Sequence, residues 1–444
     1  MDKRKIQNIF EKIIDMSEAD ETEIRLSIER EALTRFAQNY IHQNVDNYDI
    51  DLTIRTIIGK KTASATTNSL NEDAVKTTLG NAITATKFQN DNKKLLPLPG
   101  KQKYNQVNKF SQNTFSYTPE QRAEGVAKAV NICKKNRLEA AGIFSTNTTE
   151  LSLGNSAGLF AYNKSTQADF SITAMHNTAS GWNEVIKRDV DDIDIKKSVN
   201  IAVDKAMRSD FPVSIEPGTY PVILEPAAVA EIILFLLFKG FNGMDYLEGT
   251  SFLANKLNKQ VFSKNLTIID DPYNEDINAL PFDFEGMPVK KIELVKNGIT
   301  KNFVTNRWIA KKLGVSNNAH AIPLPAQGAY PFAMSVAPGN SSVKNMIENS
   351  QKAILVTHFH YTNIIDPKSL VITGMTRDGL YLVENGKITK PLKNMRFTDS
   401  VLNIFSNIEE ISKLREFAGG FFGGGFLVPA MKISKFNFSS STEF

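Results

Sequence analysis

Alternating apolar and polar side chains run through this sequence and constrain its fold more than any other feature. Ile24–Ile28 carries isoleucine or leucine at every second position, and Ile50–Ile54 repeats the pattern. Because neighbouring side chains of a strand point to opposite faces of a sheet, each segment is predicted to be a strand with one buried face. The same reasoning predicts further strands at Thr62–Thr67, Ala140–Thr146, Thr149–Tyr162 and Thr166–Met175.

Helical periodicity marks the segments between these strands. Apolar side chains recur at spacings of three and four from Ile6 to Ile14, which places them in one stripe along a helix. Thr118-Pro119-Glu120-Gln121 predicts a helix start, because threonine caps the N-terminus, proline fits the first turn and glutamine closes a capping box. This helix is expected to end near Asn136. Other helices are expected at Glu72–Phe88 and Ile193–Met207.

A proline-rich stretch, Phe211–Pro221, divides the chain and is the predicted linker. Beyond it, Ile232–Phe238 is the most apolar segment. A membrane span needs about 20 apolar residues, so we expect a buried helix there. Two Asn-Gly pairs, which begin at Asn297 and Asn385, predict two-residue hairpin turns among the strands that follow.

These patterns predict a two-domain α+β fold. Residues 1–210 would form an N-terminal domain, in which helices flank an antiparallel sheet. Residues 211–221 would be the linker, and residues 222–444 would form a strand-rich C-terminal domain.

Charge and cysteine content narrow the functional classes. The 52 lysines and arginines exceed the 48 aspartates and glutamates by 4 over 444 residues, which gives no broad basic field for nucleic acid. The single cysteine, Cys133, cannot form an internal disulfide, and we expect it to be a buried small side chain in a helix. The N-terminus has no apolar stretch of the secretory type and no membrane span is predicted, so we expect a cytoplasmic protein.

Histidines are the first candidates for a metal or catalytic site. The sequence has 5 of them, and none belongs to a His-Glu-x-x-His or His-Glu-x-x-x-His helix. His358 and His360 would point to one face of a predicted strand, and Asp366 is near in sequence. Two imidazoles there could bind one metal, but no matching third and fourth ligand is evident, and we favour a hydrogen-bonded pair that lines a groove. Arg377 beside Asp378 could bind a substrate carboxylate or form a turn.

The glycine-rich segment Gly419–Gly425 could cradle an anion with its backbone N–H groups. It lacks the lysine and hydroxyl residue of a nucleotide-binding loop, so a close-packed or flexible turn is the interpretation we favour. No Gly-x-Ser-x-Gly elbow is present. The motifs alone therefore predict no catalytic residue and no metal ligand in this chain.

Several short motifs follow one another in a characteristic order: Leu224–Glu231, Glu248–Phe252, Asp283–Pro288, Lys296–Gly298, Asn306–Gly314, Thr373–Gly379 and Val383–Ile388. Their order resembles the TldD/PmbA (TldE) family, whose members have long been called modulators of DNA gyrase. The resemblance extends from about Ile9 to Phe438. It implies a cytoplasmic two-domain protein that pairs into dimers around an enclosed cavity.

TldD-type subunits of this family carry a zinc-binding His-Glu-x-x-x-His helix after the linker and a cysteine ligand near the C-terminus. By resemblance, that helix corresponds to Leu234–Lys239, which has none of these ligands and no glutamate base. The C-terminal loop corresponds to Gly419–Gly425, which has no cysteine. A hydrolytic zinc needs about three protein ligands and an open position for water. The chain thus resembles the PmbA/TldE side of the family, which has no zinc site of its own.

Our first hypothesis is a non-zinc subunit that shapes the chamber and holds a peptide or unfolded segment by sheet-edge pairing, while a TldD-like partner supplies the zinc. His358, His360 and Arg377 are the candidate substrate-binding residues. The alternatives are a homodimeric metallopeptidase with a site built on the two histidines, and a peptide-binding protein without catalysis. Whether this chain is itself an enzyme stays open.

Overall fold

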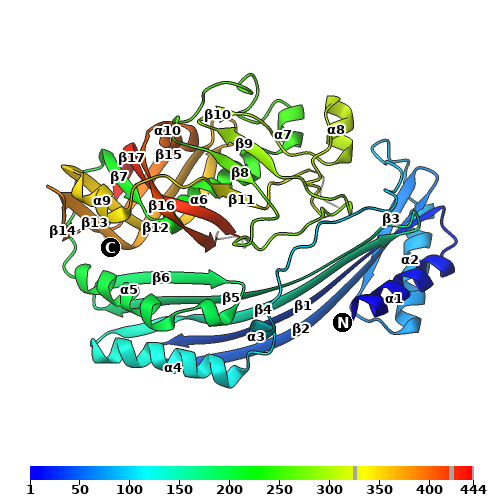
Figure 1. Ribbon diagram of the computed structural model, residues 1–444, viewed down its shortest axis with the longest axis horizontal. Coiled ribbons are helices and arrows are strands. Elements are labelled where there is room, and N and C mark those ends of the chain that lie inside the picture. The colour runs from blue at the N-terminus through cyan, green and yellow to red at the C-terminus, as the bar shows by residue number, and fades with distance from the viewer. Residues whose placement is uncertain (324–327, 420–424, 443–444) are drawn as a thin grey trace.

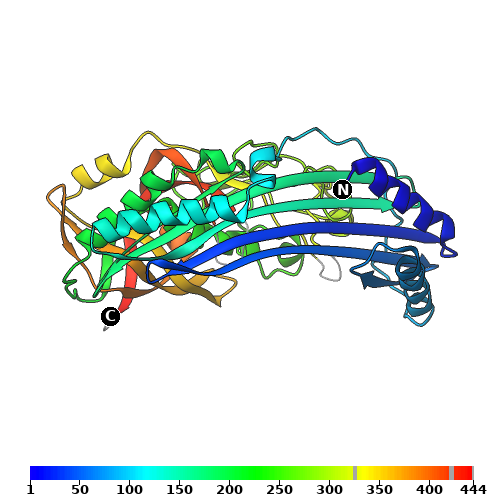
Figure 2. The same ribbon diagram turned by 90° about the horizontal axis from the view of Figure 1, so that it is seen from below.

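The computed structural model describes residues 1–323, 328–419 and 425–442. A long, curved N-terminal sheet carries the C-terminal part of the chain on its concave side (Figure 1). The turned view shows that the strands of this sheet extend along most of the length of the molecule (Figure 2).

The N-terminal sheet is antiparallel throughout and has the strand order β3-β2-β1-β4-β5-β6. The alternation predicted in its first strand is confirmed, because Ile24, Leu26 and Ile28 are buried and the residues between them are half-buried. The strands are β1 (Glu21–Ala37), β2 (Tyr40–Ile58), β3 (Lys61–Thr67), β4 (Glu139–Asn155), β5 (Phe160–His176) and β6 (Ala179–Lys187).

Helices cover the face of this sheet that is turned away from the C-terminal part. One pair packs on the buried side chains of β1 and β2, and a second pair packs on those of β4 and β5. The capping box is confirmed: the Thr118 hydroxyl accepts from Gln121 N, and the Gln121 side chain accepts from Thr118 N. The helices are α1 (Lys3–Met16), α2 (Glu72–Lys87), α3 (Gln112–Phe115), α4 (Pro119–Lys135) and α5 (Ile195–Arg208), with a 3₁₀ turn at Val190–Asp192.

The C-terminal sheet is mixed, with parallel pairings of β7 with β12 and of β11 with β17. Strands β7, β12, β13, β15 and β17 close into a ring, because β17 pairs with both β15 and β7. The strands are β7 (Gly218–Leu224), β8 (Ile268–Asp270), β9 (Ile292–Lys296), β10 (Ile299–Thr300), β11 (Met334–Val336), β12 (Lys352–Asp366), β13 (Val371–Glu384), β14 (Lys387–Pro391), β15 (Met395–Ser400), β16 (Ile408–Gly419) and β17 (Gly425–Ser441).

The apolar segment after the linker forms helix α6 (Pro226–Phe235), which continues into a π-helical turn, Leu236–Gly240. Its side chains share one apolar core with those of β7, β12 and β17. The predicted buried helix is therefore confirmed. Shorter helices lie elsewhere in this part of the chain, namely α7 (Gly243–Leu247), α8 (Arg307–Leu313), α9 (Val343–Glu348) and α10 (Val401–Ser406).

The predicted fold class is confirmed, and so are both Asn-Gly turns, which join β9 to β10 and β13 to β14. Some strand bounds are wrong. Ala140–Thr146 and the first half of Thr149–Tyr162 form the single strand β4, and the next turn lies at residues 156–159. The pattern misses β6, whose sequence shows no regular apolar alternation. The end of the predicted linker, Gly218–Pro221, forms the first part of β7. The predicted domain bounds, residues 1–210 and 222–444, stay a prediction.

Gly181 allows helix α5 to approach β6 closely. A Cβ at this position would lie 2.2 Å from Ala202 O and 2.3 Å from Ala206 N. We predict that Gly181→Ala lowers the free energy of unfolding by about 1–3 kcal/mol, because the backbone of α5 must shift. Gly80→Ala is the matched control, since Gly80 lies inside α2 with free space around it and alanine favours helices. Equal denaturation midpoints for the two variants would contradict this close contact.

Candidate functional site

Helix α6 and its π-helical turn occupy the position to which the resemblance assigns a zinc-binding helix. Leu234, Leu236 and Leu237 are at most 7% exposed and pack in the apolar core. Hydrocarbon side chains offer no lone pairs to a metal. At the end of the turn, Lys239 Nζ lies 3.7 Å from Asp245 Oδ2. This segment therefore provides packing and an ion pair instead of metal ligands.

The donor groups of the described chain do not fit a zinc site. Across residues 1–323, 328–419 and 425–442, no group of three or more His, Cys, Asp or Glu side chains is placed to hold a metal ion. Cys133 is buried in α4, as expected, and burial raises the pKa of its thiol to about 11. A thiol with so high a pKa is a poor nucleophile and ligand at neutral pH. The glycine-rich segment between Gly419 and Gly425 lies outside the described residues.

His358 lies at the interface between the two domains. Its ring stacks on Trp182 of β6, with the ring centres 4.4 Å apart and the planes inclined by 27°. Its Nε2 lies 3.2 Å from Asp378 Oδ2, and its Nδ1 lies 3.1 Å from the carbonyl oxygen of Phe359. Because both ring nitrogens face acceptors, neither is free to bind a metal without breaking a contact.

Asp378 lies beside His358 at a point where the backbone of strand β13 is irregular. Its φ is 50° and that of Gly379 is 131°, a conformation that glycine adopts without strain. The carboxylate interacts with His358 and with Ser180 of β6. Burial raises the pKa of Asp378, but the hydrogen bonds of His358 and Ser180 and the charges of His358 and Arg377 together hold the pKa below its usual value. The Arg377-Asp378 motif thus connects the C-terminal domain to β6.

His360 and Arg377 lie beside this contact and reach the surface. The Arg377 side chain is 51% exposed, and its Nε lies 3.6 Å from Asp378 Oδ2. Burial, followed by the charge of Arg377, lowers the pKa of His360, so this imidazole is neutral at pH 7. The structure therefore brings the three predicted residues together, with His358 and His360 half-buried and Arg377 exposed. Their role in binding a substrate stays a prediction.

His320 is a buried histidine that the sequence patterns do not single out. Its Nε2 lies 2.9 Å from Asp270 Oδ1, and its Nδ1 lies 3.1 Å from Asn318 Oδ1. The second oxygen of Asp270 accepts from Ala333 N. His320 and Asp270 are both at most 2% exposed, so this pair fixes β8 to its neighbouring loops. An isolated histidine gives no sequence signal from which its partner could be named.

The Asp283–Pro288 motif forms a tight turn that packs on the N-terminal sheet. The Asp283 carboxylate accepts from the backbone N–H groups of Glu285, Met287 and Ala321. Burial, the largest influence, raises the pKa of Asp283 to about 7, although these hydrogen bonds oppose it. Phe282 packs in one cluster with leucines of β4 and of the turn after it. This motif therefore has a structural role at the domain interface.

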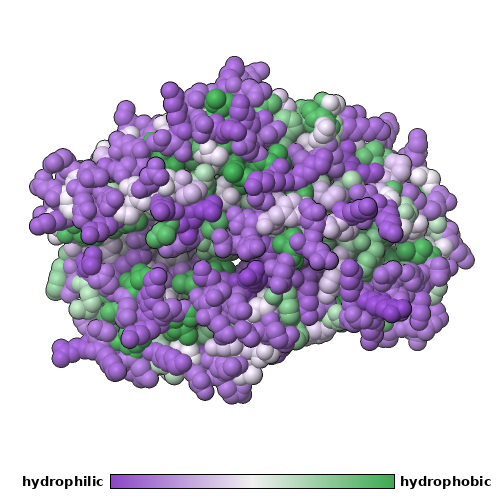
Figure 3. Space-filling view, viewed as in Figure 1, coloured by the Kyte–Doolittle hydropathy of each residue, from purple (hydrophilic) through white to green (hydrophobic). Residues whose placement is uncertain are grey.

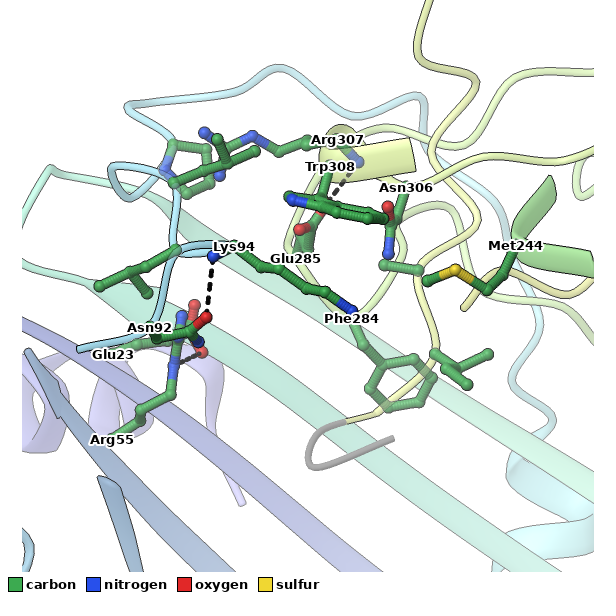
Figure 4. Close-up of a pocket in the computed structure, with 15 residues that line it drawn as sticks. Glu23, Arg55, Asn92, Lys94, Met244, Phe284, Glu285, Asn306, Arg307 and Trp308 are labelled. Carbon is green, nitrogen blue, oxygen red and sulfur yellow. Dashed lines mark hydrogen bonds and ion pairs between the residues drawn. The ribbon is translucent and has the colours of Figure 1, made fainter. Parts of the chain in front are cut away.

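A small cavity of about 110 Å³ lies where α8 meets the segment that crosses from α2 (Figure 4). The Arg307 N–H donates to Glu285 Oε2 at 3.0 Å, and its guanidinium donates to Pro97 O at 2.6 Å. Lys94 Nζ lies 4.7 Å from the centre of the Trp308 ring. These contacts fix the crossing segment to the C-terminal domain, and the cavity is smaller than a typical ligand pocket of about 300–1,000 Å³.

Two carboxylates, Asp169 of β5 and Glu184 of β6, lie close together on the face that meets β16. Burial and the charge of Glu184 raise the pKa of Asp169 to about 8. Burial also raises the pKa of Glu184, although a hydrogen bond from Gly419 N opposes the change. The pair therefore retains a proton near neutral pH.

Comparisons with known proteins agree with this architecture. Residues 217–440 match the family model described as the PmbA/TldA metallopeptidase C-terminal domain, and residues 22–86 match PmbA/TldA metallopeptidase domain 1. The fold is thus that of a chain built from metallopeptidase-family domains. The first match alone spans half of the sequence, and the chain belongs to the PmbA/TldD family.

Individual relatives are more distant. The chain is 28% identical over 204 residues to a metalloprotease TldD homolog of Buchnera aphidicola, and 25% identical over 217 residues to the metalloprotease PmbA of Escherichia coli O157:H7. These alignments cover 44% and 48% of this chain, but only 41% and 45% of the relatives. The chain thus matches less than half of the length of each of these two relatives.

Solved structures share nearly the whole fold. TldE from Thermococcus kodakarensis superposes with a TM-score of 0.88 at 22% identity, over 97% of this chain and 99% of that one. A Thermotoga maritima protein whose name connects it with modulation of DNA gyrase gives 0.87 at 17% identity, again over 97% and 99%. In the described residues, no helix is long and apolar enough to cross a membrane.

A double-mutant cycle tests the contact between Trp182 and His358. Trp182→Ala and His358→Ala each remove the stacking. The sum of their two losses of unfolding free energy should therefore exceed the loss in the double variant by about 0.5–1.5 kcal/mol. Trp182→Ala combined with Trp308→Ala is the matched control, since Trp308 lies in α8 against Lys94, and those losses should add. A coupling energy near zero for Trp182 and His358 would contradict the contact.

The raised pKa of Asp169 predicts a pH dependence of stability. In the unfolded chain this pKa is about 3.9, so between about pH 4 and pH 8 the unfolded state releases a proton that the folded state keeps. The free energy of unfolding should therefore fall as the pH rises through this range. Asp169→Asn should make the free energy of unfolding depend less on pH. Compared with the unchanged protein, the variant should be more stable at pH 8 than it is at pH 5. Parallel melting-temperature profiles from pH 5 to pH 8 for the two proteins would refute the assignment.

Proposed function

We propose that this chain is a PmbA/TldE-like, non-zinc subunit of a cytoplasmic TldD/TldE-type metalloprotease that acts on peptides or unfolded segments. The segment Leu234–Lys239 carries this proposal. It offers leucine, phenylalanine and lysine at the position where TldD-type chains are expected to hold ligands and a glutamate base. The fold shared with the archaeal TldE supports the same assignment.

The proposal divides the chemistry between two chains. A TldD-like partner would supply zinc, its ligands and the general base. This chain would shape the chamber and hold the peptide. Arg377 is a better candidate for substrate contact than His358, because its side chain is 51% exposed and that of His358 is 14% exposed. His360 remains a candidate beside it. His358 would act as a positioning residue, since its ring nitrogens and face are occupied by Asp378, Phe359 and Trp182.

A homodimeric metallopeptidase built on His358 and His360 is the main rival. A zinc ligand must present an unprotonated nitrogen with a free lone pair. His358 would have to leave either Asp378 or the Phe359 carbonyl to do so. A peptide-binding protein without catalysis would need no such change at His358. It differs from the proposed subunit because it would not associate with a zinc-bearing partner chain.

Affinity purification of the full chain from its native host tests the proposal. We predict that it recovers a second chain with a His-Glu-x-x-x-His helix, and that peptide hydrolysis requires both chains and is lost when the glutamate of that motif is changed to glutamine. The tag expressed alone is the control. Failure to recover such a chain, or a host genome that encodes none, would refute the partner-subunit function.

A further inference from the structure

Within the described residues, strand β2 has a long edge that no other strand covers. Its last part, Leu52–Ile58, pairs with β3 on one side, and β1 pairs with β2 from Tyr40 to Ile57 on the other. Among the described residues, its first part, Tyr40–Asp51, has β1 as its single strand partner. Tyr40 and Tyr48 are 56% and 59% exposed. A long uncovered edge presents unpaired backbone N–H and C=O groups, which bind an added strand.

A groove crosses the face of the N-terminal sheet and reaches β2 at Asp49–Asp51, the end of this open edge. It has a volume of about 750 Å³, and its floor includes Asp49 and Asp51 of β2 and Glu29 of β1. Its opposite wall includes Leu280 and Phe284 of the C-terminal domain. On the opposite face of the molecule, the space-filling view shows the surface also hollowed between the two domains, with hydrophilic and hydrophobic residues around the hollow (Figure 3). A strand added at the edge beside Asp49 would point alternate side chains to the same face of the sheet as Asp49, at the end of this groove.

The groove floor carries negative charge that the protein itself does not balance. Glu29 and Asp49 stand directly opposite each other in the register of β1 and β2. Like charges in that arrangement repel. The neighbouring carboxylate of Asp51 does have a cationic partner, since Arg25 Nη2 lies 3.5 Å from Asp51 Oδ1. In the described part of the chain, neither Glu29 nor Asp49 makes an ion pair, so a cation from outside would relieve the repulsion.

We propose that the Tyr40–Asp51 edge binds an extended peptide that carries lysine or arginine at alternate positions. The peptide backbone pairs with β2, and its basic side chains meet Glu29 and Asp49 in the groove. This inference goes beyond the proposed function, because it names a second peptide-binding surface on β2, away from the contact of His358 with β6. It rests on that function only for the choice of a peptide as ligand.

A second copy of the same edge is a poorer occupant. Tyr40–Asp51 contains three aspartates and no lysine or arginine. Two such edges would therefore bring carboxylates together without supplying a cation. A basic peptide supplies the missing charge, which is why we assign the edge to a peptide.

Fluorescence anisotropy of the full chain with labelled twelve-residue peptides tests the proposal. A peptide of alternating lysine and threonine should bind at least about tenfold more tightly than one of alternating glutamate and threonine, and added salt should reduce the difference. The double variant Glu29→Gln/Asp49→Asn should bind the lysine peptide about tenfold more weakly than the unchanged protein does. Glu124→Gln/Glu139→Gln, with changes at exposed positions of α4 and of the start of β4, is the matched control and should bind like the unchanged protein.

Backbone pairing is tested separately with N-methylated peptides. In a strand, the N–H groups of alternate residues point to opposite edges. Methylating every lysine amide therefore blocks one edge, and methylating every threonine amide blocks the other. We expect one of the two peptides to lose binding and the other to keep it. Equal binding of the two peptides would overturn edge pairing, and equal binding of lysine and glutamate peptides would overturn the charge preference.

These measurements use this chain alone, so they separate the inference from the proposed function. Failure to bind the lysine peptide, together with recovery of a zinc-bearing partner, would overturn only the inference. Light scattering on the same samples identifies a competing occupant. A dimer that must dissociate before the peptide binds would assign the edge to a second copy and overturn the proposal.

Discussion

The burial of helix α6 against strands β7, β12 and β17 is the constraint on which the C-terminal domain depends. Its side chains are the centre of the largest apolar core in the described chain. The same burial limits the chemistry, because Leu234, Leu236 and Leu237 are held by packing and offer no donor atoms. Replacing them by histidine or glutamate would place polar groups in an apolar core. The burial of these leucines therefore stabilises the C-terminal domain and also leaves no metal ligand at these three positions.

Three of the seven motifs that carry the resemblance lie at the interface between the domains. Asp283 closes a turn that packs on β4, Arg307 holds the crossing segment, and Asp378 joins β13 to β6 through His358 and Ser180. None of these groups is presented as a free nucleophile or metal ligand. Their contacts set the position of the C-terminal domain over the concave face of the N-terminal sheet, and thereby the shape of the groove between them (Figure 1).

Local patterns predicted much of the fold and little of the site. The period of apolar residues identified α1 and β1, and the Thr118 capping box and the Asn297 turn were correct because they depend on a few adjacent residues. Strand β6 was missed, since its burial is decided by packing against the following helix, α5, and against β13, which is distant in sequence. For the same reason, spacing placed His358 and His360 on one face but could not reveal that Trp182 and Asp378 occupy the first of them.

The zinc content of the chain purified alone, measured by elemental analysis after dialysis against trace zinc, tests the central claim most directly. The account predicts well below one zinc per chain, with no change in a His358→Ala/His360→Ala variant. One zinc per chain, lost in that variant, would contradict it and would establish a metal centre built by this polypeptide.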